Sequence, residues 1–103
     1  MSAPADPAGG TTALRVRIEG RVQGVWFRSW ACEKAAELGL SGWVRNRADG
    51  TVEAVFAGAK EMVDRMVVLC RRGPPLAKVT TLTTTPETAD VLPGFRELPT
   101  VYR

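Results

Sequence analysis

A short loop with two glycines, followed by an arginine, is the part of this chain best suited to chemistry. The loop consists of Gly20, Arg21, Val22, Gln23, Gly24 and Val25. Both glycines permit main-chain conformations that other residues resist, and they let a ligand approach closely. If a helix begins after the loop, its unpaired N–H groups and the positive end of its dipole favour an anion there. Arg28 adds a cation with several donors, so the pattern predicts a site for phosphate or another small anion.

Hydrophobic spacing predicts that the loop joins a strand to a helix. Leu14, Val16 and Ile18 alternate with charged residues, which is typical of a half-buried strand over 13–19. After the loop, apolar residues recur at helical spacing up to Leu38. The same reasoning predicts strands at 41–47, 51–57, 77–84 and 95–98, and a second helix at 60–72. This order predicts an α+β fold, a ferredoxin-like βαββαβ sandwich whose antiparallel sheet carries two helices on one face and a short fifth strand.

The composition fits one globular domain and disfavours several functional classes. The chain has 103 residues, 45% of them hydrophobic, and no apolar run long enough to cross a bilayer. Residues 1–12 are rich in Ala, Pro and Gly and lack the features of a secretory signal, so we expect a disordered tail before a domain at 13–103. Cys32 and Cys70 fit buried thiols in a cytoplasmic protein better than a disulfide or a metal site. The net charge of +3 comes from dispersed basic residues, which suit a small anionic ligand as well as nucleic acid.

The chain has no histidine, which removes the commonest general base and a common ligand of zinc. A hydrolytic reaction would therefore rely on positioning and electrostatics, or on a carboxylate. Asp49 and Glu53 are acids of a kind that is usually solvated, in a turn and on a strand, so neither is assigned a role. We expect Trp30 and Trp43 in the core, whereas Trp26 either lines the mouth of the anion site or lies on the surface.

The loop and its surroundings resemble the first signature of the acylphosphatase family. The matching residues are Ile18, Gly20, Val22, Gln23, Gly24, Val25, Phe27 and Arg28. A second signature of the family follows in the expected order, in Gly42, Trp43, Val44, Arg45, Asn46, Gly50, Val52 and Gly58. The resemblance covers residues 14–99, and two spaced signatures are far more specific than a lone glycine loop.

This resemblance implies roles for individual residues. Gly20 and the main-chain amides of residues 21–25 would cradle a phosphoryl group, and Arg28 would bind it. The sequence pattern alone indicates only that Asn46 is a polar residue near a turn. By resemblance, Asn46 would orient the attacking water through an amide that both donates and accepts hydrogen bonds. The implied enzyme is a hydrolase that cleaves the carboxyl–phosphate bond of acyl phosphates by in-line attack of water on phosphorus, with no metal or other cofactor.

The expected ligand is thus a small acyl phosphate, with inorganic phosphate and other anions as competitors. We expect a cytoplasmic monomer that binds neither membranes nor nucleic acid. The alternative is a ferredoxin-like binding or accessory domain without turnover. RNA-recognition domains of this fold use exposed aromatics on central strands, whereas the strand at 13–19 presents Arg15, Arg17 and Glu19. Accessory domains of this type begin the much longer hydrogenase carbamoyl-transfer maturation proteins.

Overall fold

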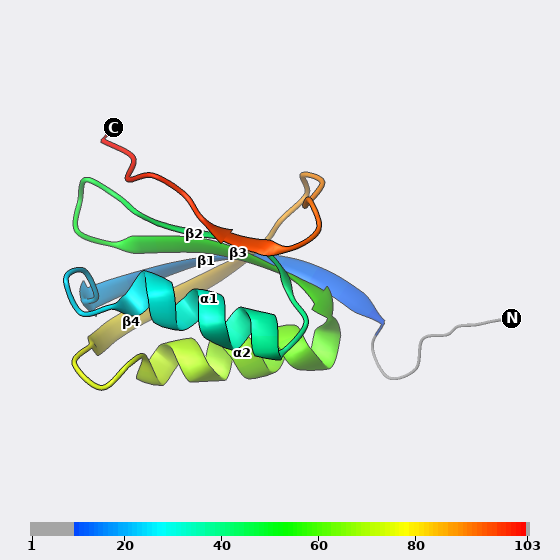
Figure 1. The fold of residues 1–103 in the computed structure, drawn as a ribbon, viewed down its shortest axis with the longest axis horizontal. Helices are drawn as coiled ribbons and strands as arrows, with labels where there is room; N and C mark the ends of the chain where they lie inside the picture. Colours follow the sequence, from blue (N-terminus) through cyan, green and yellow to red (C-terminus); the bar gives the residue numbers. More distant parts are fainter. Residues whose placement is uncertain (1–9, 103) are drawn as a thin grey trace, which may run out of the picture.

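Two helices lie against one face of a five-stranded sheet and leave the other face open (Figure 1). The structure, a computed structural model, describes residues 10–102. Its elements are β1 (Thr11–Arg21), α1 (Phe27–Glu37), β2 (Ser41–Asn46), β3 (Val52–Ala59), α2 (Lys60–Arg72), β4 (Lys78–Pro86) and β5 (Phe95–Glu97). The strand order is β4-β1-β3-β2-β5, antiparallel throughout except for the parallel pair β2–β5. The predicted α+β, ferredoxin-like fold is confirmed, and β5 makes the sheet a mixed one.

The core lies between the sheet and the helices, where the alternation of β1 predicts it. Val16 and Ile18 are fully buried, and Leu14 packs against them at the margin. The two helices contribute apolar faces at helical spacing, namely Phe27, Ala31 and Ala35 from α1 and Val63, Met66 and Cys70 from α2. Burial of these side chains is the main term that stabilises the helices, because neither has a side-chain cap at its N-terminus.

Two tryptophans expected in the core are only partly buried. Trp30 sits at the margin of the helical layer, with its ring edge against Phe27 at a centroid distance of 5.3 Å. Trp43 lies on the open face, because Val44 takes the inward position of β2. Its ring contacts Arg45, whose guanidinium carbon is 4.6 Å from the ring centroid. The prediction that Trp43 lies in the core was therefore wrong, because its side chain is on the open face of the sheet.

The strands β1 and β3 are longer than their sequence patterns indicate. Thr11 and Thr12, expected in the N-terminal tail, pair with Ala59 and Gly58 at the far end of β3. Gly58 was expected to end that strand, but the chain stays extended there, and a Cβ would lie 2.8 Å from a side-chain carbon of Leu40. The rest of the expected tail, residues 1–9, lies outside the described residues. Within residues 10–102 no helix has both the length and the apolarity needed to span a membrane.

Candidate active site

The topology brings three chain segments to one end of the sheet. Strands β1 and β2 both run antiparallel to β3, and β5 runs parallel to β2, so the three strands end on the same side. The loop after β1, Asn46 at the end of β2 and Glu97 at the end of β5 therefore meet. A cavity of about 340 Å³ opens there, lined by Val22, Gly24, Trp26, Phe27, Arg28, Ser29, Asn46 and Glu97.

The loop at the floor of this cavity presents unpaired main-chain donors. Gly24 and Trp26 both have positive φ, at 72° and 67°, on either side of Val25. Left-handed residues next to right-handed ones turn successive N–H groups into a concave nest for an anion. Within the described chain, the N–H groups of residues 23–26 donate no hydrogen bond, and no side chain caps α1. These donors and the helix N-terminus are the groups that the sequence pattern predicts to bind an anion.

The two glycines of the loop do different things. Gly20 lies inside β1 at an irregularity of the pairing with β4, and a Cβ there would lie 2.2 Å from the carbonyl oxygen of Lys78. It is required for strand packing, because main-chain atoms cannot yield that space. A Cβ on Gly24 would meet nothing within 4 Å. Gly24 thus leaves open space beside the cavity, which is where an anion can approach the main chain closely.

This contrast gives a matched pair of substitutions. We expect Gly24→Ala to fold, with a loss of roughly 1 kcal/mol from the left-handed backbone, and to bind inorganic phosphate clearly more weakly. Gly20→Ala should lower the melting temperature much more, because it clashes with β4. Thermal unfolding and phosphate titration by calorimetry measure the two effects. Unchanged phosphate affinity in folded Gly24→Ala would count against close approach of the anion at this residue.

The predicted site residues are not all placed at the cavity. Val22, Gly24, Arg28 and Asn46 line it together. Four others do not line it, namely Gly20, Arg21, Gln23 and Val25. Gly20 and Arg21 belong to β1 and pair with β4, and the Val25 side chain is buried in the core. At Gln23 and Val25, therefore, only main-chain groups can contact a ligand in the cavity.

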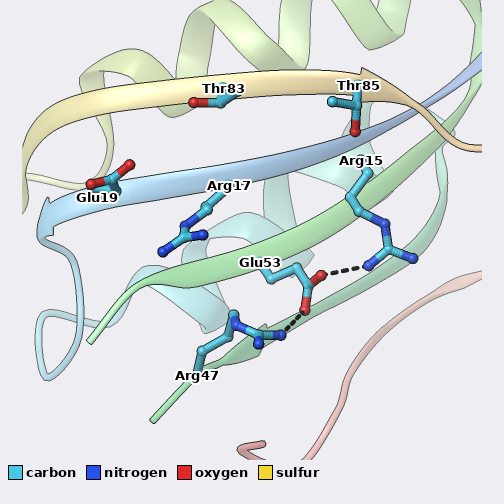
Figure 2. A pocket seen from close by; sticks show the side chains of 7 residues that line it. All are labelled: Arg15, Arg17, Glu19, Arg47, Glu53, Thr83 and Thr85. Atoms are coloured by element: carbon cyan, nitrogen blue, oxygen red, sulfur yellow. Dashed lines mark hydrogen bonds and ion pairs between the residues drawn. The ribbon is translucent and has the colours of Figure 1, made fainter. Parts of the chain in front are cut away.

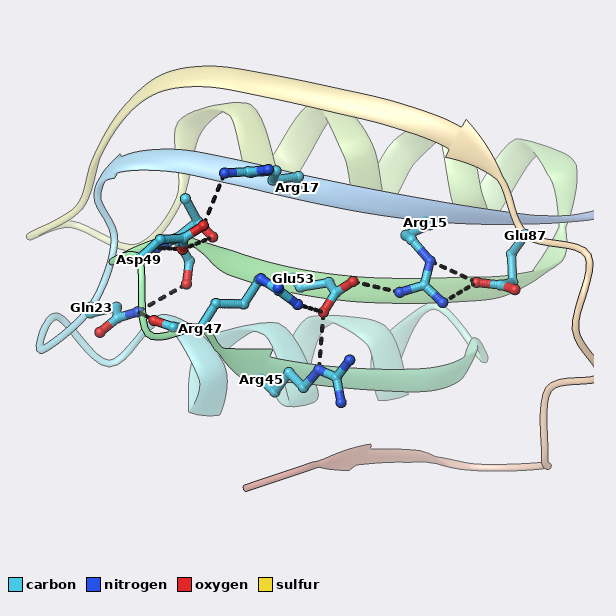
Figure 3. Close-up of polar contacts among 9 residues, drawn as sticks. Arg15, Arg17, Gln23, Arg45, Arg47, Asp49, Glu53 and Glu87 are labelled. Carbon is cyan, nitrogen blue, oxygen red and sulfur yellow. Dashed lines mark hydrogen bonds and ion pairs between the residues drawn. The ribbon is translucent and has the colours of Figure 1, made fainter. Parts of the chain in front are cut away.

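The side chain of Gln23 has a role that the sequence did not indicate. Its amide nitrogen donates to the carbonyl oxygens of Arg47, at 2.8 Å, and Thr51, at 2.9 Å. These two carbonyls flank the turn between β2 and β3. Gln23 thus fixes the anion loop to the hairpin that carries Asn46, which sets the distance between the two halves of the site (Figure 3).

Asn46 combines burial with an unused hydrogen-bonding group. It is the last residue of β2, and only 9% of it is exposed. Its Oδ1 atom is buried and has no hydrogen-bond partner within residues 10–102. A buried polar atom without a partner is unfavourable by about 1–3 kcal/mol, so such atoms are rare outside functional sites. Asn46 also lines the cavity, so its amide is a candidate group for binding a ligand there.

Arg28 is held in place by an acid that sequence analysis missed. Its Nη1 atom lies 3.0 Å from Oε2 of Glu97, and both side chains are partly exposed. A single contact of this kind leaves other N–H groups of the guanidinium open to the cavity. The pattern around 95–98 predicts a strand but not its neighbour, and only the β2–β5 pairing brings Glu97 to α1.

Neither cysteine is suited to act as a nucleophile at this site. Cys32 lies one helical turn after Arg28, where burial and the nearby charge of Glu97 raise the pKa of its thiol. Complete burial raises the pKa of Cys70 to about 12. Both thiols are protonated at neutral pH, and a protonated thiol is a poor nucleophile.

A second and larger hollow, of about 440 Å³, lies on the open face of the sheet and contains a paired carboxylate (Figure 2). Its centre is Glu53, which binds Arg15, Arg45 and Arg47 (Figure 3). Burial disfavours the charged carboxylate, but hydrogen bonds from these three arginines outweigh burial and hold the pKa of Glu53 below its usual value. The expectation that Glu53 is solvated was wrong. Glu53 is buried and ion-paired, so it stabilises the sheet and does not act as a general base.

The fold and the cavity together define a ferredoxin-like domain with a loop of unpaired main-chain donors, an arginine and a buried amide at one end of the sheet. The family model named Acylphosphatase matches residues 14–96. The chain is 56% identical over 88 residues to an acylphosphatase of Rhodospirillum rubrum, which covers 85% of this chain and 97% of that protein. It is 53% identical over 89 residues to an acylphosphatase of Rhizorhabdus wittichii, and the match covers 86% of this chain and 90% of that protein.

A solved structure agrees with these relatives. An acylphosphatase from Coxiella burnetii superposes with a TM-score of 0.82 at 34% identity, over 85% of this chain and 93% of that one. The chain therefore belongs to the acylphosphatase family.

Proposed function

We propose that the cavity between the anion loop and Asn46 hydrolyses acyl phosphates to a carboxylate and inorganic phosphate. The observation that carries this proposal is the buried, unpartnered Oδ1 atom of Asn46, a residue that lines the same cavity as Arg28. An anion-binding loop alone would suit a phosphate carrier equally well. A second, neutral polar group beside the anion site is what hydrolysis requires, because water has to be held as well.

The phosphoryl group binds to the loop and to Arg28. The unpaired N–H groups of residues 23–26 and the N-terminus of α1 contact its oxygens, and the open N–H groups of Arg28 add charge-assisted hydrogen bonds. Charge spreads over the phosphoryl oxygens in the transition state. Donors fixed in advance stabilise this charge without having to reorganise.

Asn46 holds the attacking water. Its Oδ1 accepts a hydrogen bond from the water and orients a lone pair toward phosphorus. The water oxygen forms a bond to phosphorus while the bond from phosphorus to the acyl oxygen breaks, and the carboxylate leaves with that electron pair. The carboxylate of an acyl phosphate is a good leaving group, so the water's proton can pass to an oxygen of the departing substrate. No histidine, cysteine thiolate or metal takes part in this scheme.

The open face of the sheet does not favour the binding-module alternative. Its aromatic residue, Trp43, lies on β2 and is covered by the guanidinium groups of Arg15 and Arg45, 5.4 Å and 4.6 Å from the ring centroid. These cation–π contacts compete with stacking of the ring on an RNA base. Inorganic phosphate is the expected competing ligand of the cavity, and a monomeric state and a cytoplasmic location stay predictions.

The bond that breaks can be tested with isotope-labelled water. Hydrolysis of an acyl phosphate in oxygen-18 water, with a chelator present, is expected to place the label in inorganic phosphate. Label in the carboxylate would mean attack at the carbonyl carbon and would contradict the proposed site. The stereochemistry at a chiral phosphoryl group is the second measurement, because direct attack inverts phosphorus and a phosphoenzyme route retains its configuration. Loss of turnover in the chelator would argue for a metal.

A further inference from the structure

Trp26 departs from three local rules that a sequence normally follows. It has φ 67° and ψ 22°, a left-handed conformation that glycine or asparagine usually occupies. It stands at the N-cap of α1, yet its side chain makes no capping hydrogen bond. It is also 75% exposed, although it is a large apolar residue. Conflicts of this kind concentrate at functional positions, where the side chain is needed for something other than stability.

The residues that line the cavity indicate what the side chain of Trp26 is needed for. Three of the lining residues have sizeable apolar side chains, Val22, Trp26 and Phe27. Val22 and Phe27 are 1% and 2% exposed, so they offer a ligand almost no surface. Trp26 is thus the one exposed large apolar residue among those that line the cavity, and it lies two residues before Arg28 in the sequence.

We propose that Trp26 binds the acyl group of the substrate, and that the chain prefers acyl phosphates with a flat, apolar acyl group such as an aromatic ring. This inference rests on the proposed function, because it assigns the part of the substrate that the anion loop does not hold. The loop, Arg28 and Asn46 account for the phosphoryl group and water. The acyl group is what remains, and an indole binds a flat ring by offset stacking or edge contact.

The size of the cavity agrees with this assignment. Sites for small molecules occupy about 300–1,000 Å³, and the cavity has about 340 Å³. It therefore has room for a small aromatic acyl phosphate. Specificity for the acyl group then depends on one exposed ring, that of Trp26. The ring can be removed without altering the donors proposed to bind phosphate.

The test compares acetyl phosphate with benzoyl phosphate in four variants. Trp26→Ala and Trp26→Gly both remove the ring, but glycine also relieves the left-handed backbone, so together they separate the ring from the geometry. Trp26→Phe keeps an aromatic ring. Val68→Ala is the matched control, since Val68 is an exposed apolar residue of α2 that does not line the cavity.

We expect Trp26→Ala and Trp26→Gly to raise KM for benzoyl phosphate about tenfold, which is about 1.4 kcal/mol of binding. KM for acetyl phosphate should change far less, and Trp26→Phe should keep most of the preference for benzoyl phosphate. Val68→Ala should match the unsubstituted protein on both substrates. Equal effects of ring removal on the two substrates would overturn the proposal. So would a loss in Trp26→Ala that Trp26→Gly does not share, because the cause would then be the backbone.

A binding measurement keeps this inference separate from the proposed function. Phenylphosphonate and methylphosphonate carry the same anionic group and cannot be hydrolysed as acyl phosphates. Calorimetry should show phenylphosphonate binding about tenfold more tightly to the unsubstituted protein, and equal binding of the two to Trp26→Gly. If the protein turns over neither acyl phosphate, the proposed function fails, and the two phosphonates still decide whether Trp26 binds a ring. Equal affinities in the unsubstituted protein would refute the role of Trp26.

Discussion

Arg28→Ala is expected to lower kcat/KM for acyl phosphates by about a thousandfold while the protein stays folded. The loss is large because the guanidinium is the cation of the site and contacts oxygens on which charge develops. Stability should change little, since the ion pair that Arg28 makes with Glu97 joins two partly exposed side chains. Steady-state kinetics and a thermal melt measure the two quantities.

The ion pair with Glu97 makes a further control necessary. Removing Arg28 leaves an unpaired carboxylate in the cavity, and its charge repels the phosphoryl group. Arg28→Ala combined with Glu97→Gln removes that repulsion, so it should regain part of the lost phosphate affinity but little of the turnover. Arg28→Lys should rescue poorly, because a point charge does not reproduce the fork of donors. Near-normal turnover in folded Arg28→Ala would remove Arg28 from the mechanism.

Local patterns were sufficient to predict the part of the site that is close in sequence. The alternation in β1 and the helical spacing after it placed the loop between a strand and a helix, and the helix starts one residue before Arg28. Asn46 was assigned to the same site through the family resemblance, and in the structure β1 and β2 run in the same direction, which puts their ends on one side of the sheet. The resemblance to a family supplied the roles, which spacing alone left open.

Contacts between distant segments could not be predicted in this way. Glu97 reaches Arg28 only because β5 pairs with β2, and nothing in the strand pattern specifies that neighbour. Gly20 looked like part of the ligand loop, but its lack of a side chain is explained by the main chain of β4. Glu53 looked solvated from its position on a strand, but it binds Arg15 of β1, Arg45 of β2 and Arg47 directly after β2. For Glu97 and Gly20 a partner far along the chain determines the environment, and for Glu53 the sheet brings Arg15 of β1 to two arginines of the same hairpin.

Asn46→Ala should abolish most of the turnover and leave phosphate binding nearly intact. We expect kcat to fall about a hundredfold or more, because the attacking water loses its fixed position. The fold should tolerate the change, since Oδ1 of Asn46 makes no hydrogen bond within residues 10–102 and its removal leaves no partner unsatisfied. Kinetics, a thermal melt and phosphate titration are needed on the same samples.

The phosphate titration decides between two roles for Asn46. If the amide holds water, phosphate affinity should stay within about threefold of the unsubstituted protein, whereas Arg28→Ala should weaken it far more. Asn46→Asp is the matched control, because it keeps the shape and an acceptor but adds a negative charge beside the anion. It should therefore weaken phosphate binding while Asn46→Ala does not. A loss of phosphate affinity in Asn46→Ala as large as that in Arg28→Ala would place Asn46 in the anion cradle and leave the water without its proposed ligand.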